Sequence, residues 1–238
     1  PIIMLSDLDL GMNDNMSEPL EWNDDYQYQR GKVLSAEDLE NMSERFGRYL
    51  DVDNDGIPYR TYPGTHPTKG SFFTRGTSRD EFAVYTEDGA EYVHNMERLL
   101  KKWETAKQYV PAPVIIRAKG GSSIGLIHFG TSRDATLEAI DYLAQEGIEV
   151  DSCQVRAFPF TQSVEDFIDE HESVFIIEQN RDGQLRSLLV NDCHFSPSDL
   201  VSILNYDGMP ITARYIKEQV TSVINNEKVL PLRRKKAK

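Results

Sequence analysis

The sequence predicts an α/β protein with a doubly wound, mostly parallel sheet over residues 111–228, preceded by a long irregular linker and a helix. Three observations predict it. From Ser123 onward, short apolar segments alternate with amphipathic segments, which is the order of strands and crossover helices in a parallel sheet. The apolar segments are almost uninterrupted, as in strands covered on both faces. Residues 12–67 are instead polar and contain many Asn, Asp, Pro and Gly, which is typical of irregular structure.

The α/β part is expected to contain four strands and the helices that follow them. A strand over 124–129 is followed by a helix that Thr131 caps, with Asp134 three residues on, and that ends at Gly147. The same alternation continues with strands at 148–155, 174–177 and 201–204 and helices around 164–169, 184–190 and 216–224. Such an order places helices on both faces of the sheet.

The linker, residues 12–110, is expected to contain two helices. The first, near 36–46, begins with the capping-box pair Ser35 and Asp38 and ends at Gly47. The second, near 89–109, has apolar residues at helical spacing and ends before a proline. Irregular stretches of this length are uncommon inside a self-contained domain, so we expect the linker to wrap over another domain or subunit.

The two ends of the chain carry further expectations. Residues 1–11 open on an apolar run that is typical of a buried strand, and a strand needs neighbouring strands to be stable. We therefore expect this run to belong to a piece of a longer protein. The basic tail, 229–238, is expected to be a solvated terminus.

Composition excludes several classes of function. The net charge of −13 over 238 residues would repel nucleic acid and anionic membranes over most of the surface. The two cysteines, Cys153 and Cys193, lie far apart without a signal peptide, which favours a reducing compartment and a cytoplasmic protein. No apolar run approaches the roughly 18 residues that span a bilayer.

A metal site is not favoured by the spacing of the candidate ligands. Asp51, Asp53 and Asp55 begin like a calcium-binding loop, but Tyr62 stands where a closing Glu is needed. An Asp- and Asn-rich turn is the preferred interpretation, and cation binding stays open. Cys193 and the histidine after it supply too few ligands for zinc or an iron–sulfur cluster.

Two turns that leave strands for helices are candidate anion sites. Ligands of open α/β sheets favour the carboxyl ends of the strands, where helix amides point outward. Both turns could equally be ordinary helix caps without a ligand. The candidate residues are Gly130, Thr131 and Ser132 in one turn, and Asn180, Arg181, Asp182 and Gly183 in the other.

The densest polar segment of the chain, 74–81, is a candidate substrate or interface site. Arg75, Arg79, Asp80 and Glu81 surround a glycine between aromatic pairs. Arginine offers a bidentate fork to a carboxylate, so the segment suits a carboxylate substrate. An ion-pair network that fixes a loop at an interface is an equal alternative.

Several segments together resemble one family, the 2-oxoacid:ferredoxin (flavodoxin) oxidoreductases. The opening residues resemble the last strand of that family's pyrimidine-binding domain, and two linker segments resemble its 2-oxoglutarate branch. Three turns of the α/β part are similar to the signature turns of the family's transketolase-like carboxy-terminal domain. The resembling segments are 5–13, 60–65, 73–81, 157–160, 178–185 and 206–211.

The resemblance implies a catalytic α subunit that is active only in an assembled complex. In such enzymes the ylid of thiamine diphosphate attacks a 2-oxoacid, carbon dioxide leaves, coenzyme A takes the acyl group, and iron–sulfur clusters pass electrons to ferredoxin. It also implies that thiamine diphosphate and Mg²⁺ are held by the pyrimidine-binding domain and the β subunit. The iron–sulfur cluster would lie on a partner chain, and a γ-type domain or subunit would complete the assembly.

We therefore expect the linker and transketolase-like domain of an α subunit that acts on 2-oxoglutarate. No catalytic residue is assigned within these residues. Alternatives are the same enzyme class acting on pyruvate or on a broad range of 2-oxoacids, and a non-catalytic α/β module that assembles subunits or binds a nucleotide.

Overall fold

The computed structural model describes residues 2–12, 14, 16–76 and 78–227. The chain divides into two compact units. Unit 1 consists of Pro1–Ser17 and Val110–Lys238, and unit 2 of Glu18–Tyr109. The basic tail expected over 229–238 lies outside the described residues.

Unit 1 contains a five-stranded sheet. The strand order is β1-β3-β2-β4-β5, in which β2 to β5 pair in parallel and β1 pairs antiparallel with β3. This confirms the predicted mostly parallel α/β fold. The strands are β1 (Val114–Ile116), β2 (Ile124–Phe129), β3 (Asp151–Val155), β4 (Ser173–Glu178) and β5 (Leu200–Leu204).

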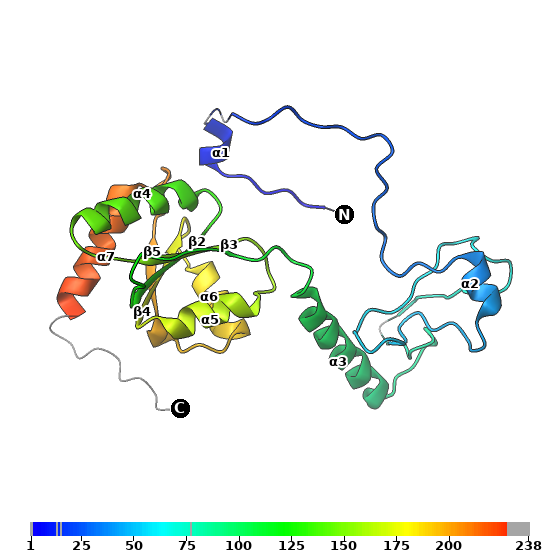
Figure 1. Cartoon of the computed structure of the whole chain (residues 1–238). Helices are drawn as coiled ribbons and strands as arrows, with labels where there is room; N and C mark the ends of the chain where they lie inside the picture. The colour runs from blue at the N-terminus through cyan, green and yellow to red at the C-terminus, as the bar shows by residue number, and fades with distance from the viewer. Residues whose placement is uncertain (1, 13, 15, 77, 228–238) are drawn as a thin grey trace. The chain divides into compact units, whose positions relative to one another are not determined.

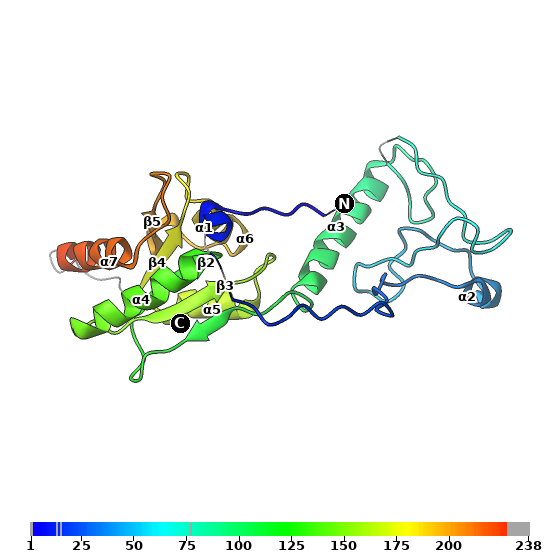
Figure 2. The ribbon, with the colours of Figure 1, turned by 90° about the horizontal axis from the view of Figure 1, so that it is seen from above.

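Helices cover both faces of this sheet, as Figures 1 and 2 show. Helices α4 and α7 pack on one face, and α5 and α6 pack on the other. Because crossovers go to both faces, the sheet is doubly wound. The helices are α4 (Ser132–Gln145), α5 (Gln162–Glu170), α6 (Gln184–Asp192) and α7 (Ala213–Glu227), with a single 3₁₀ turn, η1 (Pro197–Asp199), before β5.

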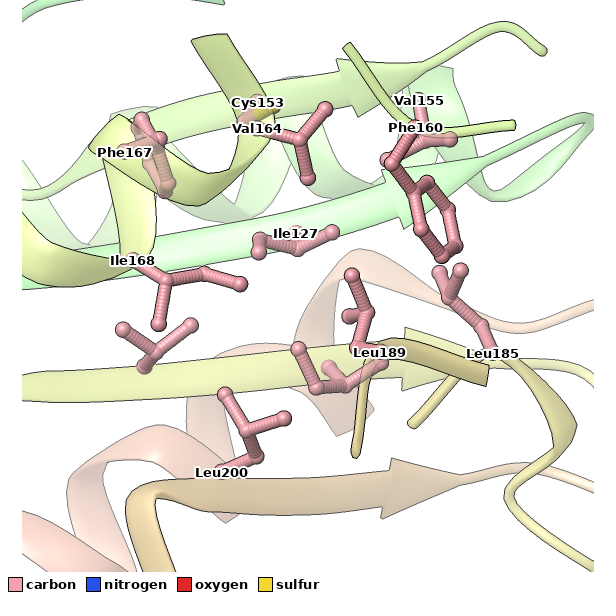
Figure 3. Packing of buried hydrophobic residues seen from close by; sticks show 12 residues of the cluster. Ile127, Cys153, Val155, Phe160, Val164, Phe167, Ile168, Leu185, Leu189 and Leu200 are labelled. Atoms are coloured by element: carbon pink, nitrogen blue, oxygen red, sulfur yellow. The ribbon is translucent and has the colours of Figure 1, made fainter. Parts of the chain in front are cut away.

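The core between the sheet and helices α5 and α6 is shown in Figure 3. Ile127, Phe167 and Leu189 there are fully buried. Each such side chain contributes about 1.5–3 kcal/mol through its removal from water. Gly125 in β2 makes this packing possible, since a Cβ there would lie 2.7 Å from a ring carbon of Phe167. The near-continuous apolar sequence of the strands thus corresponds to burial on both faces.

Unit 2 is mostly irregular, with helices α2 (Ala36–Asn41) and α3 (Gly89–Ala106). The predicted capping box is confirmed, since the Asp38 N–H donates to Ser35 Oγ at 3.1 Å and the Ser35 N–H donates to the Asp38 carboxylate at 2.8 Å. Helix α2 nevertheless ends five residues before the predicted limit of 46. Met42 turns to extended backbone there, while Gly47 packs against Leu50 instead of ending the helix.

Three other features differ from what the sequence predicts. The strand expected within 1–11 does not form in this chain, where Leu8–Met12 is the short helix α1 and the exposed Ile2–Leu5 pair with no strand among the described residues. The strand expected over 148–155 begins only at Asp151. The edge strand β1 was not predicted, because three residues are too few to show a period.

None of the helices in the described part of the chain has the length and apolarity needed to cross a membrane.

Candidate functional site

The two candidate anion turns lie side by side at the carboxyl edge of the sheet. One follows β2, which pairs with β3 on one side and with β4 on the other, and the second follows β4. The chain connects β2 to β3 and returns to β4 on the opposite side, so the strand order reverses between β2 and β4. Ligands of open α/β sheets bind at such switch points. The fold therefore brings together two turns that the sequence separates by about 50 residues.

A hydrogen-bond chain joins the two turns. The Gln179 amide nitrogen donates to Thr131 Oγ1 at 2.9 Å, and Thr131 donates its own hydroxyl proton to the carboxylate of Asp7 at 2.5 Å. The Gln179 amide oxygen accepts from the Ile211 N–H at 3.0 Å. Thr131 therefore makes no capping bond with its side chain, contrary to expectation. The Thr131 hydroxyl and the Leu10 N–H hold the pKa of Asp7 below its ordinary value.

The turn after β4 is built around the carboxylate of Glu178. This side chain is fully buried and accepts from the N–H groups of Leu185 at 2.7 Å and Arg186 at 3.0 Å, and from the Asn180 amide at 2.8 Å. A carboxylate is stabilised at this place, because the amide groups of a helix N-terminus carry partial positive charge. The first-turn donors of α6 are thus used by a carboxylate of the chain itself.

The other candidate residues of the two turns serve local geometry. The Asn180 side-chain oxygen accepts from the N–H groups of Asp182 and Gln184 at 3.1 and 3.3 Å. Arg181 pairs with its exposed neighbour Asp182 at 2.7 Å. Ser132 donates to a backbone carbonyl oxygen of β2 at 2.6 Å. Gly130 and Gly183 adopt φ values of 57° and 59°, the left-handed region that glycine tolerates best.

Sequence reasoning missed Asp7, Glu178 and Gln179 as members of this edge. The sequence did contain an indication for Glu178, since a charged residue at the end of an apolar strand must find a partner. It contained none for Asp7, because the contact of Asp7 with Thr131 spans 124 residues.

In unit 2, the structure separates the four candidate residues of the polar segment. Asp80 accepts the N–H groups of Phe82 and Val84 with one carboxylate oxygen, at 2.9 and 2.8 Å, and so holds its own turn. Glu81 pairs with His94 of α3 at 2.9 Å. Arg75 is exposed. The segment is therefore only partly an ion-pair network.

Arg79 is half-buried and differs from its neighbours. Its guanidinium lies 5.3 Å from the ring centroid of Tyr85, with which it also forms an antiparallel bridge. Its backbone carbonyl accepts from the Asn95 amide of α3 at 2.6 Å. The Tyr85 ring thus positions the side chain, and α3 and the Tyr85 segment hold the backbone of Arg79, which favours a preorganised binding group.

The acidic loop that resembles a calcium site is compensated by lysines. The Lys32 ammonium group lies 2.7 Å from carboxylate oxygens of both Asp53 and Asp55, and Lys101 lies 3.5 Å from Asp51. The oxygens that would ligate a cation are paired with positive charge. These ion pairs favour an Asp- and Asn-rich turn over a cation site, in agreement with the interpretation preferred from the sequence.

A second buried polar cluster lies at the opposite, amino edge of the sheet. Asp151 accepts from the Ala118 N–H at 2.8 Å and from Arg117 at 2.9 Å, and one His171 ring nitrogen lies 3.2 Å away. Burial opposes the charge of Asp151, but these contacts outweigh it and hold the pKa of the carboxyl below 3.8. The cluster ties the end of β1 to the sheet.

Within residues 2–12, 14, 16–76 and 78–227, no group of three or more His, Cys, Asp and Glu side chains is placed to hold a metal ion. We therefore assign no residue to Mg²⁺, to thiamine diphosphate or to an iron–sulfur cluster.

The fold defines a class first, the doubly wound α/β domains with a mostly parallel sheet. The structure is similar to that of 2-oxoglutarate:ferredoxin oxidoreductase from Magnetococcus marinus, solved with 2-oxoglutarate, coenzyme A and succinyl-CoA bound. The TM-score is 0.67 at 18% identity, over 77% of this chain and 32% of that chain. At this identity the likeness concerns the fold.

The chain is also similar in sequence to two curated proteins, although no family model matches it. The chain is 29% identical over 186 residues to 2-oxoacid:ferredoxin oxidoreductase 2, subunit alpha, of Aeropyrum pernix, covering 76% of this chain and 27% of the relative. It is 26% identical over 153 residues to the 2-oxoacid:ferredoxin oxidoreductase subunit alpha of Saccharolobus solfataricus, covering 63% of this chain and 24% of the relative. The resemblance to these α subunits is therefore confirmed, and the chain spans about a quarter of the length of the curated relatives it matches.

Proposed function

We propose that the chain supplies the linker and the transketolase-like domain of the α-type subunit of a thiamine-diphosphate-dependent 2-oxoacid:ferredoxin oxidoreductase. The observation that carries the proposal is its similarity to two α subunits over most of its length. The proposed domains are the end of a pyrimidine-binding domain over 1–11, a linker over 12–110 and the transketolase-like domain over 111–228.

We propose that the reaction is the oxidative decarboxylation of 2-oxoglutarate to succinyl-CoA. Thiamine diphosphate supplies the decarboxylating chemistry when bound. We place this cofactor with its Mg²⁺ in the pyrimidine-binding domain and the β subunit, the iron–sulfur cluster on a partner chain, and ferredoxin as electron acceptor. A γ-type domain or subunit completes the complex.

The preference for 2-oxoglutarate rests on Arg75 and Arg79. A dicarboxylic 2-oxoacid differs from pyruvate by a distal carboxylate, and a guanidinium fork binds a carboxylate through two parallel hydrogen bonds. Arg79 is the stronger candidate, because its side chain is already positioned on the Tyr85 ring. Asp80 and Glu81 support the loop through their own contacts.

The test measures kcat/KM for 2-oxoglutarate and for pyruvate in the assembled complex, with Arg75→Ala and Arg79→Ala. Loss of a charge-assisted pair costs about 1.5–3 kcal/mol, so we expect the preference for 2-oxoglutarate to fall by roughly tenfold or more. Arg60→Ala is the matched control, since Arg60 is exposed and its guanidinium also lies near a tyrosine ring, 5.4 Å from Tyr62. If the preference is unchanged in both variants, neither Arg75 nor Arg79 binds the distal carboxylate of 2-oxoglutarate.

For unit 1 we propose a supporting role within the complex. The observation in favour is that the two turns at its carboxyl edge already hold carboxylates of the chain, Asp7 and Glu178. Calorimetry of the chain with coenzyme A and with adenine nucleotides tests this. Tight binding of either would favour an independent nucleotide site instead.

A further inference from the structure

Unit 2 contains a small cavity beside α3 with both polar and apolar residues in its lining. Its volume is about 170 Å³. Cavities of about 150 Å³ accommodate a molecule as large as benzene, so the space suits a ligand of a few non-hydrogen atoms. The cavity is lined by Tyr49, Ser78, Arg79, Tyr92, Asn95, Met96, Arg98 and Leu99.

Three segments far apart in the sequence are tied together around this space. The Tyr49 N–H donates to the Glu81 carbonyl oxygen at 2.9 Å. The Asn95 amide of α3 donates to the Arg79 carbonyl oxygen at 2.6 Å. Hydrogen bonds of the backbone and of one side chain therefore hold the segments that line the cavity together.

Arg98 is the buried residue of α3 and lies in this wall. Its exposed fraction is 8%, yet the only hydrogen bond found for its side chain in the described part of the chain goes from Nη1 to the Gly56 carbonyl oxygen, at 3.0 Å. Its Nε has no partner among these residues. Burial lowers the pKa of the Arg98 guanidinium, and the positive charge of Arg48 lowers it further, while the more distant charge of Asp51 only partly opposes them. A buried cation that forms no direct ion pair is costly.

Arg79, which also lines the cavity, resembles Arg98 in this respect. Its Nε is buried and also lacks a hydrogen-bond partner within the described residues. Neither Arg79 nor Arg98 forms an ion pair with an acidic group there, although other cations do, such as Arg117 with Asp151 and Lys32 with Asp53. The chain has 39 acidic residues against 26 Lys and Arg. A shortage of carboxylates therefore does not explain why these two arginines form no ion pair.

We propose that Arg79 and Arg98 bind a small carboxylate in this cavity. Two guanidinium groups offer donors in the planar geometry that a carboxylate accepts, and burial strengthens the bonds. The proposal shares Arg79 with the proposed substrate site and in that respect rests on the proposed function. Binding is measured on the chain alone, so it is tested separately from turnover in the assembled complex. Succinate, a dicarboxylate, and acetate, a smaller monocarboxylate, serve as probes of size.

The test is an NMR titration of the full chain with succinate and with acetate, following the Nε–H signals of Arg79 and Arg98. We expect both signals to shift together and to saturate with one dissociation constant. Arg98→Lys retains the charge but removes the fork, so affinity should fall by roughly tenfold, and Arg79→Met should give a similar loss. Arg60→Met, the matched control, should bind as the unmodified chain does.

Three outcomes would overturn the proposal. The Nε–H signals fail to move with either carboxylate, sodium chloride at equal ionic strength moves them equally, or Arg60→Met weakens binding as much as Arg79→Met. Because Arg98 is buried, backbone amide spectra of Arg98→Lys verify the fold. If that variant does not fold, Arg79→Met decides the question, since the backbone contacts of Arg79 remain.

Discussion

Replacing His128 by leucine should make the stability of unit 1 less sensitive to acid. His128 lies in β2 and has an exposed fraction of 1%. Its Nδ1 has no hydrogen-bond partner among the described residues. Burial, aided by the positive charge of Arg133, lowers the pKa of His128 from 6.5 to about 4. The folded sheet therefore holds a neutral imidazole over a range in which the unfolded chain is protonated.

The sign and size of the effect follow from this difference in proton binding. Between pH 6.5 and about 4 the unfolded chain binds a proton that the folded chain does not, so stability falls as pH is lowered through this window. A pKa of about 4 against 6.5 corresponds to a total loss of about 3 kcal/mol. The leucine variant has no such group and should lose about 3 kcal/mol less over this range.

Hydrogen exchange of the β2 and β4 amides measures this stability locally, because these strands form the centre of the sheet. An NMR titration of the imidazole signals, assigned by the signal that His128→Leu removes, measures the pKa itself. His94→Leu is the control, since His94 is half exposed in unit 2. An imidazole midpoint near 6.5, or equal acid sensitivity of the unmodified chain and His128→Leu, would refute the reasoning.

Three further predictions concern buried contacts. Glu178→Ala should destabilise unit 1 by about 3–5 kcal/mol in urea unfolding, because it leaves the α6 amides unpaired, whereas the exposed Glu172→Ala should cost less than about 0.5 kcal/mol. The pKa of Asp151 is lowered in the folded chain, so its contribution is present above an ordinary value of 3.8 and is lost as pH falls below it. Asp151→Asn should therefore flatten the acid limb of a stability–pH curve below about pH 4. Gly56→Ala should lower the melting temperature of unit 2, since Gly56 has φ +77° and a Cβ would lie 2.3 Å from the Lys102 nitrogen, a strain worth about 2 kcal/mol or more.

The sheet of unit 1 was predictable because burial on both faces leaves a direct trace in the sequence. Strand β2 was predicted at its observed limits, and β4 to within one residue at each end. Strand β1 was not found, since its three residues are only partly covered and pair at the edge. The segment 148–150 has strand-like residues, but it does not pair with β2, whose register with β3 begins at Asp151.

Unit 2 was less predictable because its contacts are long-range. The apolar spacing of α3 correctly predicted a helix, but its buried residue is Arg98, which the periodicity did not single out. Arg98 reaches Gly56, which lies 42 residues away, and the cavity residues come from three segments. Such a cluster arises from tertiary packing of an irregular chain, for which no local period exists. The sequence singled out Arg79 by its residue type, whereas only the structure showed that Arg98 lines the same cavity.

The two turns at the carboxyl edge are not equivalent as anion sites. Glu178 is fully buried, and an anion that took its place at α6 would leave that carboxylate charged and unpaired inside the protein. Asp7 is exposed, and releasing it from Thr131 would return its carboxylate to water at little cost. If an anion binds at this edge, the physics therefore favours the turn of Gly130–Ser132 over that of Asn180–Gly183. Asp7→Asn, which removes the competing charge there, should increase the affinity of phosphate for the chain, whereas Glu178→Gln should not.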